Sequence, residues 1–178
     1  MTTNALTFPR FFPRPQSETG IWGWIGTVDH KRIGTLYGIT SFLWFLIAGV
    51  EALLIRVQLA SAESTFIGPE FYNQLFTMHG TTMVFLVIMP LSAAFFNWLI
   101  PLQIGSRDVA FPRLNALSYW VFLFGSLIMN AGWITGDAPN GGWFGYAPNS
   151  GVTFNPGIGM TYWVVGLNIL GVASIAAG

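Results

Sequence analysis

Long stretches without a charged residue constrain the fold of this chain more than any other feature. Four of them occur, at residues 33–50, 71–106, 114–136 and 158–178. Each has at least the ~18 residues that mark a membrane-spanning candidate. Only 8% of all residues are charged, whereas a soluble domain has about 25%. Because lipid-facing backbone groups must be hydrogen-bonded within their own segment, the chain is predicted to be all-α, a polytopic transmembrane helix bundle.

The predicted bundle covers residues 30–178, with four spans at about 33–57, 72–100, 114–134 and 158–178, and residues 1–29 form an N-terminal segment. The second charge-free stretch is longer than one crossing of the ~30 Å hydrocarbon core requires. We therefore expect Pro90 to kink this helix and Pro101 to end it. The Gly-, Pro- and Asn-rich segment 135–159 is expected to form a long loop. The fourth span has no basic or aromatic flank after it, and we expect it to be truncated.

Basic residues are distributed unevenly among the connections. Six lie before the first span or between the second and third, and only Arg56 lies between the first and second; the six are Arg10, Arg14, Lys31, Arg32, Arg107 and Arg113. Because basic connections stay on the cytoplasmic side, we expect the N-terminus and the loop 105–113 to be cytoplasmic. The chain has no cysteine, which excludes disulfide bonds and thiolate metal sites within it.

A histidine, His79, lies inside the second charge-free stretch, in TMHGTTMVFLVIMP. Ionisable residues inside a membrane are costly and mark functional sites, and a neutral imidazole is the usual nitrogen ligand of haem iron. The small residues Gly80, Thr81 and Thr82 are expected to leave room for a large group beside the ring. A core histidine that hydrogen-bonds a neighbouring helix is an equally good interpretation. The other histidine, His30, is expected to be interfacial.

The first span ends in EALLIR, which contains Glu51 and Arg56. Arg56 is expected either to extend to the outer interface or to meet a polar substituent of a cofactor bound at His79. Glu51 pairs with Arg56 or with another helix, although a spacing of five residues is not ideal for a pair on one helix.

A polar set lies toward the predicted cytoplasmic side. Asn97 and Asn115 flank Asp108 in FFNWLIPLQIGSRDVAFPRLNALSYW, and the polar residues of the third span share one helical face; these are Asn115, Ser118, Ser126 and Asn130. Such a stripe holds helices together, or it lines a path along which a carboxylate passes protons inward. The spacing alone does not separate these two hypotheses.

Five motifs, in order and at matching spacing, resemble the N-terminal part of subunit I of the haem–copper oxidases, the cytochrome c and quinol oxidases. They are DHKRIGTLY, EALLIR, YNQLFTMHGTTMVFLVIMP, NWLIPLQIGSRDVAFPRLNALSYW and GWFGYAP. The resemblance covers about residues 21 to 178. It implies part of the catalytic subunit of a respiratory terminal oxidase in a bacterial-type cell membrane. Such an enzyme reduces dioxygen to water with electrons from cytochrome c and pumps protons.

The resemblance also implies roles for individual residues. His79 matches an axial ligand of the low-spin haem, expected to be haem a, and Arg56 and Trp143 match residues beside that haem. Asp108 matches the entrance of the D proton channel, and four further residues match positions along it: Asn97, Asn115, Tyr37 and Ser174. The second haem, the copper and their ligands are expected outside this segment. The implied partners are the remainder of subunit I, subunits II and III, cytochrome c and membrane lipids, and no nucleic acid.

Three departures from the family pattern limit these expectations. Ala116 and Ala173 stand where many members have an asparagine and a channel serine. Gln58 replaces a glutamate that helps to hold an outer cation in some members, so no calcium or sodium is predicted.

The electron donor is the least determined of these features. Glu51 and Gln74 resemble two of four quinol-contacting residues of the quinol oxidases, but Ile47 and Phe71 replace the other two. This favours cytochrome c, with a quinol oxidase as the alternative. A non-redox transporter or assembly protein is the rival from another class. A four-helix dihaem cytochrome is disfavoured, because it needs several intramembrane histidines.

Overall fold

The computed structural model describes residues 20–177 and contains no β-strand in that range. Its elements are α1 (Trp22–Ile25), α2 (His30–Gln58), α3 (Pro69–Thr81), the π-helix η1 (Thr82–Ile88), α4 (Met89–Gln103), α5 (Pro112–Met129), α6 (Ala131–Thr135) and α7 (Gly159–Ala177). Four helical stretches are long and apolar enough to cross a membrane: His30–Gln58, Pro69–Gln103, Pro112–Thr135 and Gly159–Ala177. The predicted four-span helical bundle is confirmed. Arg10 and Arg14 lie outside the described residues.

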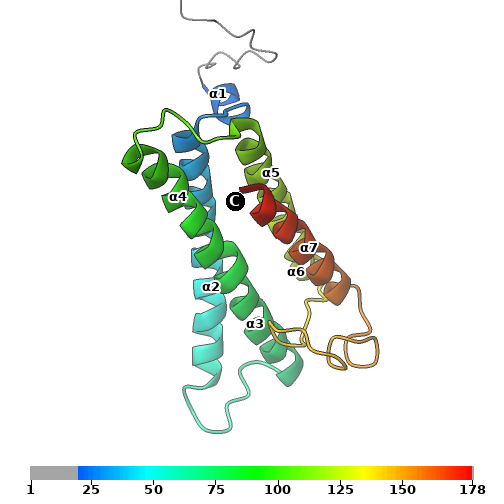
Figure 1. Cartoon of the computed structure of the whole chain (residues 1–178). Helices are drawn as coiled ribbons and strands as arrows, with labels where there is room; N and C mark the ends of the chain where they lie inside the picture. The colour runs from blue at the N-terminus through cyan, green and yellow to red at the C-terminus, as the bar shows by residue number, and fades with distance from the viewer. Residues whose placement is uncertain (1–19, 178) are drawn as a thin grey trace, which may run out of the picture.

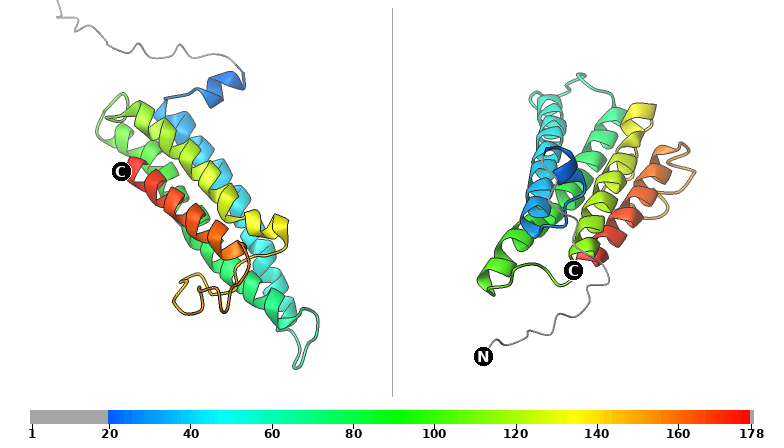
Figure 2. Two further views of the ribbon diagram at one scale, coloured as in Figure 1. Left: turned by 90° about the vertical axis from the view of Figure 1, so that its right-hand side faces the viewer. Right: turned by 90° about the horizontal axis from the view of Figure 1, so that it is seen from above.

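The spans run alternately up and down, so the connections gather at two ends (Figure 1). One end holds α1, the start of α2, the connection from α4 to α5, and the end of α7. The opposite end holds the connection from α2 to α3 and the loop 136–158. In both views of Figure 2, α5 and α7 lie side by side, next to the pair formed by α2 and the long α3–η1–α4 helix. The basic residues Lys31, Arg32, Arg107 and Arg113 therefore share one end, and which side of the membrane it faces stays a prediction.

Pro90 and Pro101 affect the second span differently. In a regular α-helix the ring of Pro90 would collide with the carbonyl of Leu86. The seven residues before Met89 form the wider π-helix η1, in which the N–H of Met89 bonds to the carbonyl of Val84. The predicted disturbance at Pro90 thus takes the form of a π-helix.

The prediction that Pro101 ends the second span is wrong, because α4 continues through it to Gln103. A proline inside a helix leaves the carbonyl four residues earlier without its usual donor, and here that carbonyl belongs to Asn97. His30 supplies the replacement, since its Nδ1 lies 2.6 Å from the Asn97 carbonyl oxygen. This contact also buries the side chain of His30, which is only 3% exposed at the first position of α2.

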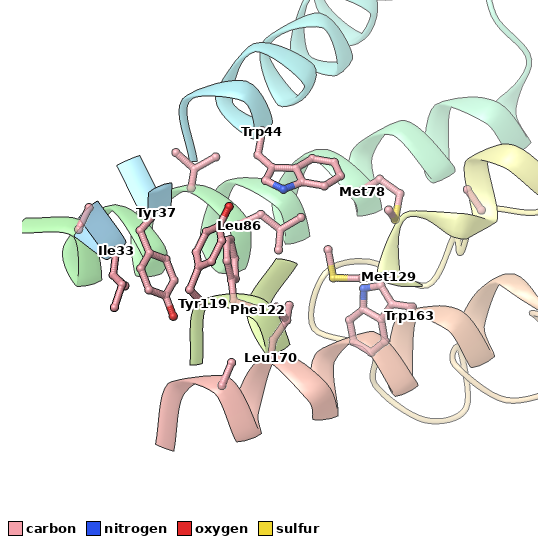
Figure 3. Packing of buried hydrophobic residues seen from close by; sticks show 14 of the residues in the cluster. Ile33, Tyr37, Trp44, Met78, Leu86, Tyr119, Phe122, Met129, Trp163 and Leu170 are labelled. Atoms are coloured by element: carbon pink, nitrogen blue, oxygen red, sulfur yellow. The ribbon is translucent and has the colours of Figure 1, made fainter. Parts of the chain in front are cut away.

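Helices α5 and α7 approach closely at Gly166. A Cβ atom added there would lie 2.5 Å from the Cβ and 2.7 Å from the Cα of Met129. Small residues at such contacts let the backbones of membrane helices come together. The core continues from this contact through Trp44, Met78 and Leu86 toward Tyr37 and Phe122 (Figure 3).

Gly166→Ala is therefore expected to lower the melting temperature of the complete protein complex. The added methyl meets backbone atoms of Met129 that cannot rotate away, and overpacking of this kind costs about 1–3 kcal/mol. Gly171→Ala is the matched control, because a Cβ at Gly171 has no atom within 4 Å and the helix propensity gained is the same. Equal melting temperatures for the two variants would contradict the close contact.

Candidate functional site

The imidazole of His79 is half-buried in the last turn of α3 and contacts α2. Its Nδ1 lies 3.0 Å from the carbonyl oxygen of Ala48. Because a carbonyl oxygen only accepts hydrogen bonds, Nδ1 carries the proton and Nε2 carries the free lone pair. A histidine held in this way has the tautomer and the fixed ring that metal-ligating histidines usually show. The contact also satisfies a core histidine, so it is compatible with both interpretations of His79.

The room expected beside His79 is filled by tryptophans. A Cβ atom on Gly80 would lie 3.1 Å from the Cβ and 3.2 Å from the Cδ1 of Trp143. Thr81 is fully buried, and its Oγ1 accepts a hydrogen bond of 3.1 Å from Nε1 of Trp163. The expectation of space at Gly80 and Thr81 is therefore wrong, because small residues let neighbouring segments approach as readily as they admit a ligand.

Open space lies instead on α2, at Gly49. A Cβ atom added to Gly49 meets nothing within 4 Å, and Gly49 follows Ala48, whose carbonyl holds His79. The donor set fits a haem iron through one group, the imidazole of His79, whose Nε2 makes no hydrogen bond within residues 20–177.

The other two candidate cofactor residues differ in their position relative to His79. Trp143, in the loop 136–158, packs on Gly80, directly after His79. Arg56 lies in the last turn of α2 and is exposed. Gly80 thus brings Trp143 next to His79, whereas no hydrogen bond or ion pair within residues 20–177 joins Arg56 to either residue.

Glu51 does not pair with Arg56. It is 5% exposed, and its Oε1 accepts a hydrogen bond of 3.2 Å from Nε1 of Trp133 on α6. The other carboxyl oxygen, Oε2, is buried and has no partner in the described part of the chain. Glu51 is thus linked to another helix, which was one of the two alternatives expected for it.

Trp133→Phe is expected to lower the melting temperature of the complete complex. The substitution keeps a ring beside Phe71, which contacts Trp133 edge-on at 5.8 Å. It removes the single hydrogen bond of the buried Glu51 carboxyl group, and an unsatisfied buried polar group costs about 1–3 kcal/mol. Trp120→Phe is the control, because that indole donates no hydrogen bond within residues 20–177. The bond would have no structural importance if both variants melted at the same temperature.

At the opposite end of the bundle, Asp108, Asn97 and Asn115 line one cavity of about 580 Å³. The amide of Asn115 donates a hydrogen bond of 2.6 Å to Oδ1 of Asn97, which joins α5 to α4. The Oδ1 of Asp108 accepts a hydrogen bond of 2.9 Å from the backbone N–H of Val109. The end of α7, at 175–177, completes the wall of the cavity.

Tyr37 extends this polar network along the bundle. Ser118 donates its hydroxyl proton to the Asn115 carbonyl at 2.7 Å, so the hydroxyl of Tyr37 is the donor in its 2.9 Å hydrogen bond to Ser118. Tyr37 and Ser174 line a second cavity of about 450 Å³ between α2, η1, α4, α5 and α7. The structure therefore brings the five candidate channel residues to two cavities. The bonds Asn97–Asn115 and Tyr37–Ser118 also hold helices together, so both hypotheses for the polar stripe remain.

The four stripe residues, three on α5 and the fourth at its C-terminal cap, are all buried: Asn115, Ser118, Ser126 and Asn130. The shared face is confirmed. Ser126 and Asn130 donate to carbonyls of their own helix, those of Leu123 and Ser126, so only the first half of the stripe links helices through these side chains.

Sequence reasoning missed Thr77 and Trp163 as neighbours of the site, and it did not identify the partner of Thr81. The N–H of Gly142 donates a 2.9 Å hydrogen bond to Oγ1 of Thr77, and Trp163 donates to Thr81. The i, i+4 spacing of the two threonines beside His79 was the available signal, but it identifies no partner.

Comparison with known proteins gives a family match over most of the chain. The model for "Cytochrome C and Quinol oxidase polypeptide I" matches residues 32–178. Cytochrome c oxidase subunit 1 of Bacillus subtilis is 47% identical over 158 residues, which are 89% of this chain and 25% of that protein. A probable cytochrome c oxidase subunit 1-alpha of Streptomyces avermitilis is 49% identical over 163 residues, 91% of this chain and 28% of that protein.

A relative that is named after a quinol as electron donor is also similar to this chain. Quinol oxidase subunit 1 of Bacillus spizizenii is 41% identical over 159 residues, which are 89% of this chain and 24% of that protein. The chain spans about a quarter of the length of these curated relatives.

Proposed function

Because the chain belongs to the cytochrome c and quinol oxidase polypeptide I family, we propose that it forms part of the catalytic subunit of a proton-pumping terminal oxidase. The complete enzyme reduces dioxygen to water with electrons from cytochrome c. This segment contributes one axial ligand of the low-spin haem and the entrance of the D-type proton channel. The observation that carries the proposal is the family match over residues 32–178, and the Ala48–His79 contact, which leaves Nε2 as a ligand atom inside a membrane-spanning helix, is compatible with it.

The haem, of the a type, supplies one-electron transfer when it is bound. His79 would bind its iron through Nε2, while the Ala48 carbonyl keeps the proton on Nδ1 and the ring in one orientation. Trp143, with 43% of its surface exposed, offers an indole N–H to an acidic haem substituent, and the exposed guanidinium of Arg56 offers a charge for the same purpose. The oxygen-reducing centre belongs to the remainder of subunit I, and subunits II and III and lipids surround it.

Asp108 collects protons at the end of the bundle that carries Lys31, Arg32, Arg107 and Arg113. This end faces the cytoplasm under the positive-inside rule. Asn97 and Asn115 line the cavity that contains Asp108, and Tyr37 and Ser174 line the next one. Cavities with several polar partners are the places where ordered waters bind, and such waters carry protons from Asp108 inward.

Two contacts support cytochrome c rather than a quinol as donor. Glu51 resembles a quinol-contacting residue, yet its carboxyl group is buried against the Trp133 indole. Phe71 stands at the position of another such residue and packs edge-on against the same indole. The side chains at these two positions thus both contact Trp133.

The test is a purification of the complete complex followed by spectra and oxygen uptake. We expect a low-spin haem band in the reduced-minus-oxidised spectrum and oxygen uptake with reduced cytochrome c. Uptake with a quinol alone would make the protein a quinol oxidase. A complex without haem would instead favour a transporter or an assembly protein, with Asp108 and the polar stripe serving ion passage.

A further inference from the structure

Three consecutive residues at the end of α3 contact three different elements. The ring of His79 bonds to the Ala48 carbonyl of α2, Gly80 packs against Trp143 of the loop 136–158, and Thr81 bonds to Trp163 of α7. Successive residues of an α-helix are rotated by about 100°. The last turn of α3 is therefore held from three sides, and each contact restricts its rotation about the helix axis.

Of the three contacts, the one with α7 restricts its side chains most. Trp163 is 7% exposed, and its ring lies against Gly145, where an added Cβ would be 2.7 Å from the ring. The hydroxyl of Thr81 accepts the indole N–H at 3.1 Å and donates to the Thr77 carbonyl at 2.8 Å. Both hydrogen-bonding functions of this fully buried hydroxyl are thus used, and the indole has little space to move. Figure 3 shows Trp163 extending from α7 into the core.

The helix changes its hydrogen-bond pattern directly after this turn. Immediately after Thr81 the helix changes into η1, with the wider hydrogen-bond pattern that accommodates Pro90. Thr82, the first residue of η1, is fully buried, and its Oγ1 has no partner in the described part of the chain. The His79 turn is therefore the last one with the regular α-helical pattern before η1.

We propose that Trp163 is a positioning residue for His79. Its indole N–H holds Thr81, and this bond fixes the rotation of the α3 turn and so the direction of Nε2 of His79. The inference rests on the proposed function, in which Nε2 binds the iron of the low-spin haem. It assigns to α7 an influence on the direction of this ligand atom, and hence on the reduction potential that a bound haem would have.

Two substitutions in the complete complex test the proposal. Trp163→Phe removes the N–H, and Thr81→Val removes the hydroxyl at nearly constant volume. Each is expected to shift the midpoint potential and the EPR g values of the low-spin haem in the same direction. The double variant is expected to shift them no further than either single variant, because both remove one bond. Thr81→Ser keeps the hydroxyl and is expected to restore the original values.

Trp44→Phe is the matched control, since Trp44 is another buried tryptophan of the same core cluster and is expected to leave both readouts unchanged. The proposal is overturned if Thr81→Val leaves the potential and the g values unchanged, or if the two single shifts add in the double variant. If the complex with Trp163→Phe does not assemble, the measurements on Thr81→Val alone decide the test. Failure of the proposed function looks different: the unmodified complex then has no low-spin haem to measure.

Discussion

His79→Ala is expected to abolish the low-spin haem signal in the reduced-minus-oxidised spectrum of the complete oxidase. Alanine removes the atom that binds the iron, and Gly80 and Thr81 offer no nitrogen or sulfur donor in its place. The main-chain carbonyl of Ala48 loses its partner as well, although the neighbouring contacts of Gly80 with Trp143 and of Thr81 with Trp163 do not involve the imidazole. We therefore expect loss of the haem with retention of the helix bundle, measured by spectroscopy and by the amount of assembled complex.

His30→Asn is the matched control, because His30 is the other of the two histidines in this chain. Its role is to bond the Asn97 carbonyl that Pro101 leaves without a donor, and an asparagine amide also donates. This variant is expected to keep the haem spectrum. A normal spectrum in His79→Ala would return His79 to the interpretation as a core histidine bonded to α2.

The helical spans were predictable because each depends on a local property, the absence of charge over a length that crosses the membrane. The ends of the helices differ from the prediction by a few residues for equally local reasons. Asp29 accepts hydrogen bonds from the N–H groups of Lys31 and Arg32 and so starts α2 at His30. Proline at the first position starts α3 at Pro69 and α5 at Pro112.

Pro101 was misjudged because its structure depends on a contact with His30 across 67 positions of sequence. A proline ends a helix where its freed carbonyl finds no donor, and no pattern around Pro101 indicates that a histidine of another span will supply one. The same limit applies at Gly80. Small residues are visible in the sequence, but the tryptophan that packs on Gly80 comes from a loop 63 residues later.

For the candidate site, helical spacing correctly predicted which residues share one face of a helix. It predicted their hydrogen-bond partners only in part. The buried stripe of α5 follows from i, i+3 and i+4 periodicity. The partners depend instead on which helices become neighbours. Asn115 bonds Asn97 on α4, and Glu51 bonds Trp133 rather than Arg56. The roles of His79, Arg56, Trp143, Asp108 and the channel residues stay predictions.

Asp108→Asn is expected to slow oxygen reduction and to uncouple it from proton pumping, while the haem spectrum stays intact. Asparagine keeps an Oδ1 that accepts the Val109 N–H, and it keeps the size of the side chain in the cavity wall. It cannot bind and release a proton, and the loss of a proton-transferring side chain costs about 10²-fold or more in rate. Oxygen uptake and proton release in proteoliposomes measure the two effects.

Asp29→Asn is the control at the same end of the bundle. Asparagine caps α2 as well as aspartate does, so this variant should pump protons normally. If Asp108→Asn also pumps normally, Asp108 is a surface carboxylate that stabilises its loop, and protons enter elsewhere.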